Sequence, residues 1–190
     1  MKKMLAILMI LLLGCQSEKT DFTPKEMVLT PQIIDELKSQ DSVHSQLTIL
    51  YRNFEPTLDR SDDILGTDEN SNGIRDDIEA LLSSIQNISQ QELNTYKKTA
   101  HYLQETLSTE YTLDSTGNSE LAQNVTAEYM KVSSCQRHLK MGIDDVHRVN
   151  QLLTALTFNT KGRTLKHLQY MRHNSGNSFT MLDADEDNCK

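Results

Sequence analysis

The sequence predicts an all-α fold, an irregular helical bundle of about five to seven helices. Apolar residues recur at spacings of three and four along most of the chain, which is the period of an amphipathic helix. The chain has only 7 Gly and 3 Pro, and aromatic residues make up 5% of it with no Trp. Few breakers and few aromatics disfavour a β-sandwich. The length of 190 residues suits one domain with short extensions.

The first fourteen residues have the pattern of a secretory signal peptide. Two lysines precede an uninterrupted apolar run over residues 5–13. This run is too short to cross a hydrocarbon core of about 30 Å at about 1.5 Å per residue. A basic start followed by a short apolar run is typical of an exported chain. The next residues, Leu12-Leu13-Gly14-Cys15, resemble the bacterial lipobox. The alternative is an ordinary signal peptide with a chance cysteine.

The lipobox resemblance implies a membrane-anchored mature protein. Cleavage would leave Cys15 first, with acyl chains on its thiol and amine, and residues 15–29 as a flexible tether. Gln16 after the cysteine implies sorting to the outer membrane, facing the periplasm or the cell surface. The whole chain has a net charge of −8, and loss of the two lysines makes it −10. This charge disfavours nucleic acid as a partner and makes the acyl chains, rather than charge, the membrane attachment.

The helical domain is predicted over residues 30–175. Its first helix begins at Thr30-Pro31, a hydroxyl cap followed by Pro at the first helical position. A second helix covers about residues 43–54. Residues 56–66 show no helical period and predict a loop, and a further helix begins near Asp76.

Three longer helices and a last one follow. Ser89 and Glu92 have the spacing of a capping box and open a helix whose apolar face extends to Leu107. The next helices run from Leu121 to about residue 139 and from Ile143 to about Leu156, with Asp144 and Asp145 expected to cap the second of them. The last helix has its apolar face at Leu165, Leu168 and Met171, and residues 176–190 are an irregular acidic tail.

One segment carries a metal-binding pattern. Residues 68–79 read Asp-Glu-Asn-Ser-Asn-Gly-Ile-Arg-Asp-Asp-Ile-Glu. Side-chain oxygens occupy the first, third, fifth, ninth and twelfth positions, and glycine occupies the sixth. The segment resembles the EF-hand calcium loop at each of these positions. The candidate ligands are Asp68, Asn70, Asn72, Asp76 and Glu79, with the main-chain carbonyl of Ile74.

The spacing suits a hard divalent cation. Ca²⁺ prefers about six to eight oxygen ligands, and alternate residues of a tight coil direct their side chains at one centre. Gly73 permits the sharp bend. Glu79 lies in the first turn of the outgoing helix, where its two oxygens close the shell. Glu69 and Asp77 are expected to add negative field outside the ligands.

The segment departs from a paired EF-hand in two respects. No helix is predicted directly before the loop, and Arg75 replaces the usual aliphatic residue at the eighth position. The site is therefore similar to the one-helix, thrombospondin type 3-like calcium loops of bacterial secreted proteins, which are structural rather than sensory. The alternative is a solvated turn without an ion. The segment 72–79 also resembles small exported gammaproteobacterial proteins, a resemblance that carries no function.

Two cysteines remain if Cys15 is acylated. In an oxidising compartment, Cys135 and Cys189 are expected to form a disulfide that fastens the acidic tail to the helix ending near residue 139. The alternative is two separate thiols. The six histidines form no metal-site pattern, and no catalytic motif occurs, so no catalytic residue is assigned.

These observations favour a calcium-binding, lipid-anchored envelope protein that acts as a structural or interaction module without catalysis. Its expected cofactor is Ca²⁺, and its expected partners are the membrane and an unidentified protein. One alternative is a calcium-dependent hydrolase whose catalytic residues are scattered in the sequence. Another is an inhibitor or chaperone-like protein that uses a helical face.

Overall fold

A computed structural model describes residues 27–112 and 117–190, and this part of the chain is helical without strands. The all-α prediction is therefore confirmed. Cys15, the signal peptide and most of the tether lie outside the described residues. None of the helices described is long and apolar enough to cross a bilayer. The helices are α1 (Pro31–Lys38), α2 (Val43–Phe54), α3 (Asp76–Ser83), α4 (Gln90–Ser108), α5 (Asn118–His138), α6 (Ile143–Thr157) and α7 (Lys161–Asn174), with 3₁₀ turns η1 (Glu55–Thr57) and η2 (Glu186–Cys189).

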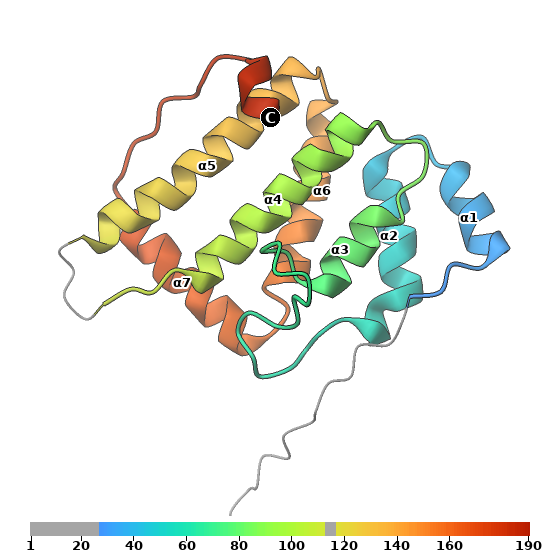
Figure 1. Ribbon diagram of the computed structural model, residues 1–190, viewed down its shortest axis with the longest axis horizontal. Helices are drawn as coiled ribbons and strands as arrows, with labels where there is room; N and C mark the ends of the chain where they lie inside the picture. Colours follow the sequence, from blue (N-terminus) through green and yellow to red (C-terminus); the bar gives the residue numbers. More distant parts are fainter. Residues whose placement is uncertain (1–26, 113–116) are drawn as a thin grey trace, which may run out of the picture.

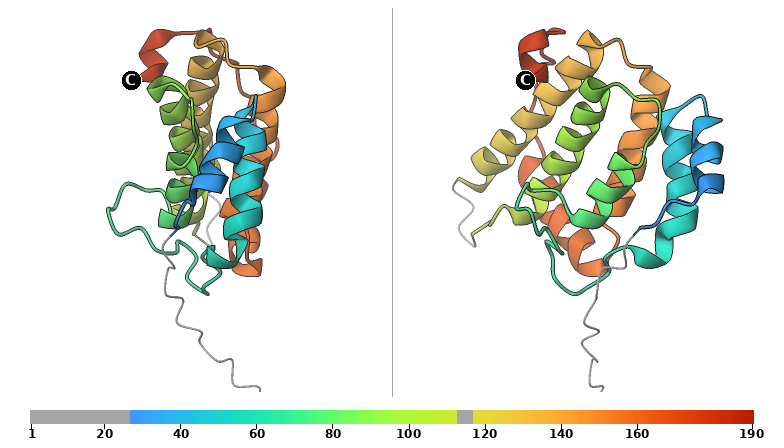
Figure 2. Two further views of the ribbon diagram at one scale, coloured as in Figure 1. Left: turned by 90° about the vertical axis from the view of Figure 1, so that its right-hand side faces the viewer. Right: turned by 45° about the vertical axis from the view of Figure 1, so that its right-hand side comes forward.

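The central helix of the bundle is α4, which packs against α3, α5, α6 and α7 (Figure 1). It lies beside α5 in one layer, whereas α2, α6 and α7 form a second layer behind them (Figure 2). The short helix α1 packs on α2 at the edge of the molecule. The loop that carries the calcium pattern connects the second layer to α3 and passes beside α4.

Hydroxyl side chains cap the N-termini of four of the helices. Thr30, Ser42, Ser89 and Thr160 each accept a hydrogen bond from a main-chain N–H three residues later. The capping box of Ser89 and Glu92 is present, as predicted. Asp145, in contrast, does not cap its own helix. Its carboxylate accepts hydrogen bonds from the N–H groups of Val43 and His44, at 3.1 and 3.0 Å, and thereby caps α2.

The main core lies between α2, α3, α4 and α6. It is built from aliphatic side chains such as Leu50, Leu82 and Leu153, which are completely buried. Met27 and Leu29, which the sequence pattern assigns to the tether, pack against this core. A smaller cluster of Ala122, Val125 and Tyr170 joins α5 to α7. Burial of these apolar faces is the main force that holds the helices together.

The apolar face predicted for α7 is wrong. Leu165, Leu168 and Met171 remain 53, 54 and 51% exposed. The residues of α7 that are buried instead are Arg163 and Tyr170, which lie two turns apart on the opposite side. The hydroxyl of Tyr170 lies 2.6 Å from that of Thr126 and 3.0 Å from that of Tyr102. The polar bonds of these two residues, rather than apolar periodicity, decide which side of α7 faces inward.

The tail is fastened to α5. Cys135 and Cys189 form the expected disulfide, with their Cα atoms 4.9 Å apart. The buried hydroxyl of Ser134 donates to the carbonyl of Asp183 and accepts from the N–H of Asp185. The tail therefore runs from α7 along α5 to the far end of that helix, where η2 lies (Figure 1). Residues 186–189 are the one regular turn of a segment predicted to be irregular.

Candidate metal centre

The loop of residues 68–79 winds around its own side chains. The Asp68 carboxylate accepts hydrogen bonds from the N–H groups of Asn72 and Gly73, at 3.1 and 2.8 Å. The amide oxygen of Asn70 accepts from the N–H of Asn72, and that of Asn72 from the N–H of Ile74. These local side-chain acceptors replace secondary structure along the loop and hold it in a tight coil.

Gly73 is required by both conformation and space. Its φ is +77°, in the left-handed region that favours glycine. A Cβ atom there would also lie 2.6 Å from Cδ2 of His101, which projects from α4. The sixth position of the loop is therefore seated directly against α4.

Three of the predicted ligands converge. Oε2 of Glu79, in the first turn of α3, accepts hydrogen bonds from the amide groups of Asn70 and Asn72, both at 2.9 Å. Oε1 of Glu79 forms an ion pair of 3.0 Å with Lys97 of α4. Burial works to raise the pKa of Glu79, but these hydrogen bonds and the charge of Lys97 together hold it below its usual value. Glu79 is therefore an anion at the centre of the loop.

Two further predicted ligands, Asp76 and Ile74, do not contact Glu79 through a hydrogen bond among the described residues. The Asp76 carboxylate, at the start of α3, accepts from the N–H of Glu69 at 3.2 and 3.3 Å. The side chain of Ile74 is buried in the main core. Asp76 and Ile74 therefore anchor the end of the loop that enters α3.

The donor set has the chemistry of a calcium site. It consists of carboxylate and amide oxygens, which hard cations prefer, on a loop with positive φ at the sixth position. The NH₂ groups of Asn70 and Asn72 face Glu79, so a half-turn of each amide would present oxygen instead. Within residues 27–112 and 117–190, no group of three or more His, Cys, Asp and Glu side chains is arranged to hold a metal. A cation at this loop would need the Asn oxygens in addition to the carboxylates.

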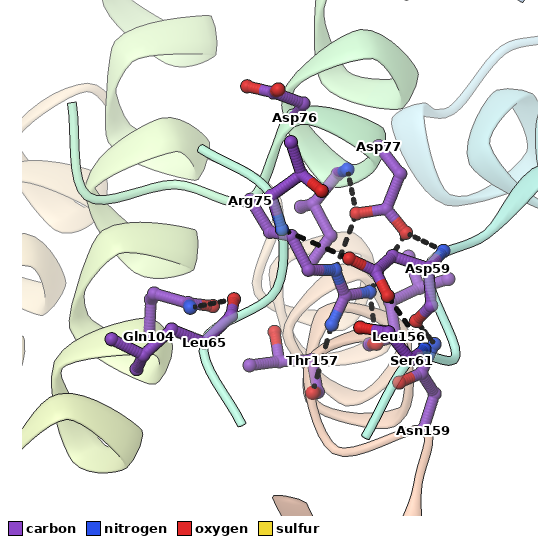
Figure 3. A network of polar contacts seen from close by, with 12 residues as sticks. Asp59, Ser61, Leu65, Arg75, Asp76, Asp77, Gln104, Leu156, Thr157 and Asn159 are labelled. Atoms are coloured by element: carbon purple, nitrogen blue, oxygen red, sulfur yellow. Dashed lines mark hydrogen bonds and ion pairs between the residues drawn. The ribbon is translucent and has the colours of Figure 1, made fainter. Parts of the chain in front are cut away.

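Arg75, the unusual residue at the eighth position, is completely buried beneath the loop. It forms a bidentate ion pair with Asp77, at 2.6 and 2.9 Å, and donates to the carbonyls of Leu156 and Thr157 at the end of α6 (Figure 3). Asp77 also accepts from the N–H of Asp59, at 2.8 Å. The expectation that Asp77 adds negative field to the loop is therefore wrong, because Arg75 neutralises it.

A second buried ion pair lies next to the first. Arg163 contacts the Asp59 carboxylate at 3.3 Å and donates to the carbonyls of Asp59, Asp63 and Ile64. Burial raises the pKa of Asp59, but hydrogen bonds from Ser61 and Thr67 and the charge of Arg163 lower it overall. Two arginines and two aspartates thus fasten residues 59–67 to the corner between α6 and α7.

Gly66 marks how tightly this network is packed. Its φ is +72°, and a Cβ atom would lie 2.4 Å from Cδ of Arg75 and 2.7 Å from the Asp59 carboxylate.

The helix α2 ends at Phe54, well before Asp68, so the candidate site is a loop followed by one helix, as predicted. The paired arginines were not predicted. The signal available for them was Arg163, which lies opposite the apolar face predicted for the last helix.

The hollows elsewhere include one of about 690 Å³ between α4, α5 and the tail, lined by Lys98, His101, Glu105, Glu128 and Asp187, among others. Another, of about 210 Å³, lies between α4, α5, α6 and α7 and is lined by Tyr102, Tyr129, His167 and Met171, among others, without a carboxylate. Burial lowers the pKa of His167, whose ring stacks on Phe158 with centroids 3.9 Å apart. Ser134, near His138 in sequence, binds the tail. His167 and Ser134 have structural partners that account for their positions.

No protein-family model matches the chain, and no curated protein or solved structure matches it either.

Proposed function

We propose that this chain is a calcium-binding, lipid-anchored envelope protein that acts as a structural or interaction module. The observation that carries the calcium proposal is the loop itself, in which Asn70 and Asn72 converge on Glu79 and the sixth position is a glycine in the left-handed region. The anchor rests on the lipobox pattern at Cys15, and the outer-membrane location rests on Gln16.

The ligands would be the side chains of Asp68, Asn70, Asn72, Asp76 and Glu79 with the carbonyl of Ile74. Bound Ca²⁺ would supply a positive centre that neutralises the carboxylates and fixes the loop. Glu79 and Gly73 connect that loop to α4 through Lys97 and His101, respectively. Arg75 connects it to the end of α6. Order that Ca²⁺ brings to the loop would thus reach helices on both sides, and these contacts support the proposal of a structural role.

The test is a calorimetric Ca²⁺ titration of the Glu79→Gln variant. This substitution removes a charge and one closing oxygen, so Ca²⁺ affinity should fall by at least about tenfold. The matched control is Glu69→Gln, which removes the same charge from an exposed side chain of the same loop. It should bind nearly as the unsubstituted protein does. Equal affinity for the two variants would show that Glu79 is not a ligand.

A further inference from the structure

Residues 161–182 differ in charge from the rest of the chain. They contain Lys161, Arg163, Lys166 and Arg172 and no Asp or Glu. The whole chain has a net charge of −8, so the remaining residues carry −12 once these four positive charges are taken away. Two of the four are paired: Arg163 with Asp59 and Lys166 with Glu110. The other two, Lys161 and Arg172, form no ion pair within the described residues.

The same segment contains most of the large apolar side chains that are exposed. Ten large apolar side chains are exposed among the described residues, and six of them fall between residues 165 and 182. At about 100° per residue, Lys161, Leu165, Leu168 and Arg172 lie within about 60° of arc on α7, with Met171 beside them. We call these five residues the α7 stripe. It is an apolar centre with a free positive charge at each end.

The disulfide keeps the acidic tail away from this stripe. Asn177, just after α7, hydrogen-bonds to Ser119 at the start of α5, whereas residues 183–189 are held by Ser134 and Cys135 near its end. Fifteen helical residues separate these points, which is about 22 Å at about 1.5 Å each. The Debye length is about 8 Å at physiological salt, so carboxylates held near the end of α5 are largely screened from the place where the tail leaves α7.

We propose that the α7 stripe rests on an anionic lipid surface, with Lys161 and Arg172 at the headgroups and the leucines at the acyl boundary. This inference rests on the proposed lipid anchor, which would hold the domain near the bilayer. The charges of the α7 stripe favour a lipid surface over a second copy of the chain. Two stripes paired about a two-fold axis would bring like charges together, whereas an anionic surface complements the positive charge at both ends. The net negative charge of the domain would orient the rest of the molecule away from that surface.

The test uses the absence of Trp from the chain. The full chain with Leu168→Trp is purified from membranes with its anchor and incorporated in vesicles of phosphatidylglycerol and phosphatidylcholine in equal parts. Its fluorescence should shift to shorter wavelength and be quenched by brominated phospholipid. The matched control is Ile143→Trp, at an apolar residue that is 82% exposed, against 54% for Leu168, and is followed by Asp144 and Asp145. Adding Lys161→Ala and Arg172→Ala to Leu168→Trp should weaken docking by about fivefold for each charge removed.

The outcomes separate docking from anchoring. If both Trp variants float with the vesicles and neither is quenched, the anchor stands and the docking proposal is overturned. If the protein fails to float, both the anchor and the docking are wrong. The Cys15→Ser variant, which cannot be acylated at that residue, shows how an unanchored protein behaves in the same flotation experiment. A blue shift of the Leu168→Trp variant that depends on protein concentration and not on lipid would assign the stripe to contacts between copies, and would also overturn the proposal.

Discussion

Two buried arginines set the environment of the candidate calcium loop. Arg75 and Arg163 have no solvent exposure, and each combines an aspartate with main-chain carbonyls as partners. Burying a charge is costly unless it is paired and hydrogen-bonded, and these two side chains meet both conditions. The eighth loop position, which in a paired EF-hand contacts a second loop, here connects the loop to α6.

Arg75→Leu should therefore be strongly destabilising. The substitution leaves Asp77 without its cation and two carbonyls at the end of α6 without a donor. Loss of one partner of a buried ion pair costs about 3–5 kcal/mol, to be measured as the free energy of unfolding in urea. The control is Arg60→Leu, which breaks the exposed pair with Glu55 and should cost less than about 1 kcal/mol.

Should Arg75→Leu fail to fold, the Arg75→Leu/Asp77→Leu double variant provides the comparison. It removes both charges, so it should be more stable than the single variant. A single variant no less stable than Arg60→Leu would contradict the account of the network.

At the scale of elements, the sequence predicted the helices well and their orientation less well. Periodicity and hydroxyl caps located α1 to α6, and the twelve-residue pattern located the loop before α3. The role of Asp145 in α6 and the buried side of α7 were harder to predict, because Asp145 and Arg163 bind partners about a hundred residues away. Apolar periodicity predicts only which apolar side chains are buried. In α7 the inward side is set by polar bonds of Arg163 and Tyr170, so the periodicity predicted the wrong face. The disulfide followed from compartment and cysteine count, without knowledge of distance.

Removing the disulfide should release the tail from α5. In the chain-entropy model, a bridge that closes a loop of this length contributes up to about 4 kcal/mol. The Cys135→Ser/Cys189→Ser variant should lose stability in urea, and a protease should cut residues 178–184 faster than in the parent protein. Unchanged cleavage there would show that hydrogen bonds, such as those of Ser134 and Arg137, hold the tail without the disulfide.

For the whole molecule, calcium should act through binding to the folded state. A ligand at about one hundred times its Kd stabilises a protein by about 2.7 kcal/mol. For a chain of this size, that is a rise in Tm of roughly 5–10 °C. The measurement is a thermal melt followed by circular dichroism in excess Ca²⁺ and in EDTA, with Glu79→Gln as the control that should not respond. Identical melts of the parent protein under the two conditions would remove the stabilising role.

The long reach of the buried network also constrains when the protein can fold. Arg75 finds its carbonyl partners 81 and 82 residues later, and Asp59 meets Arg163 after 104 residues. During synthesis, the first three helices therefore emerge long before the groups that complete their packing. We expect them to stay open until α6 and α7 have left the ribosome, so that the nascent chain passes through an unfinished form in which Asp59 lacks Arg163 and Arg75 lacks its two carbonyl partners.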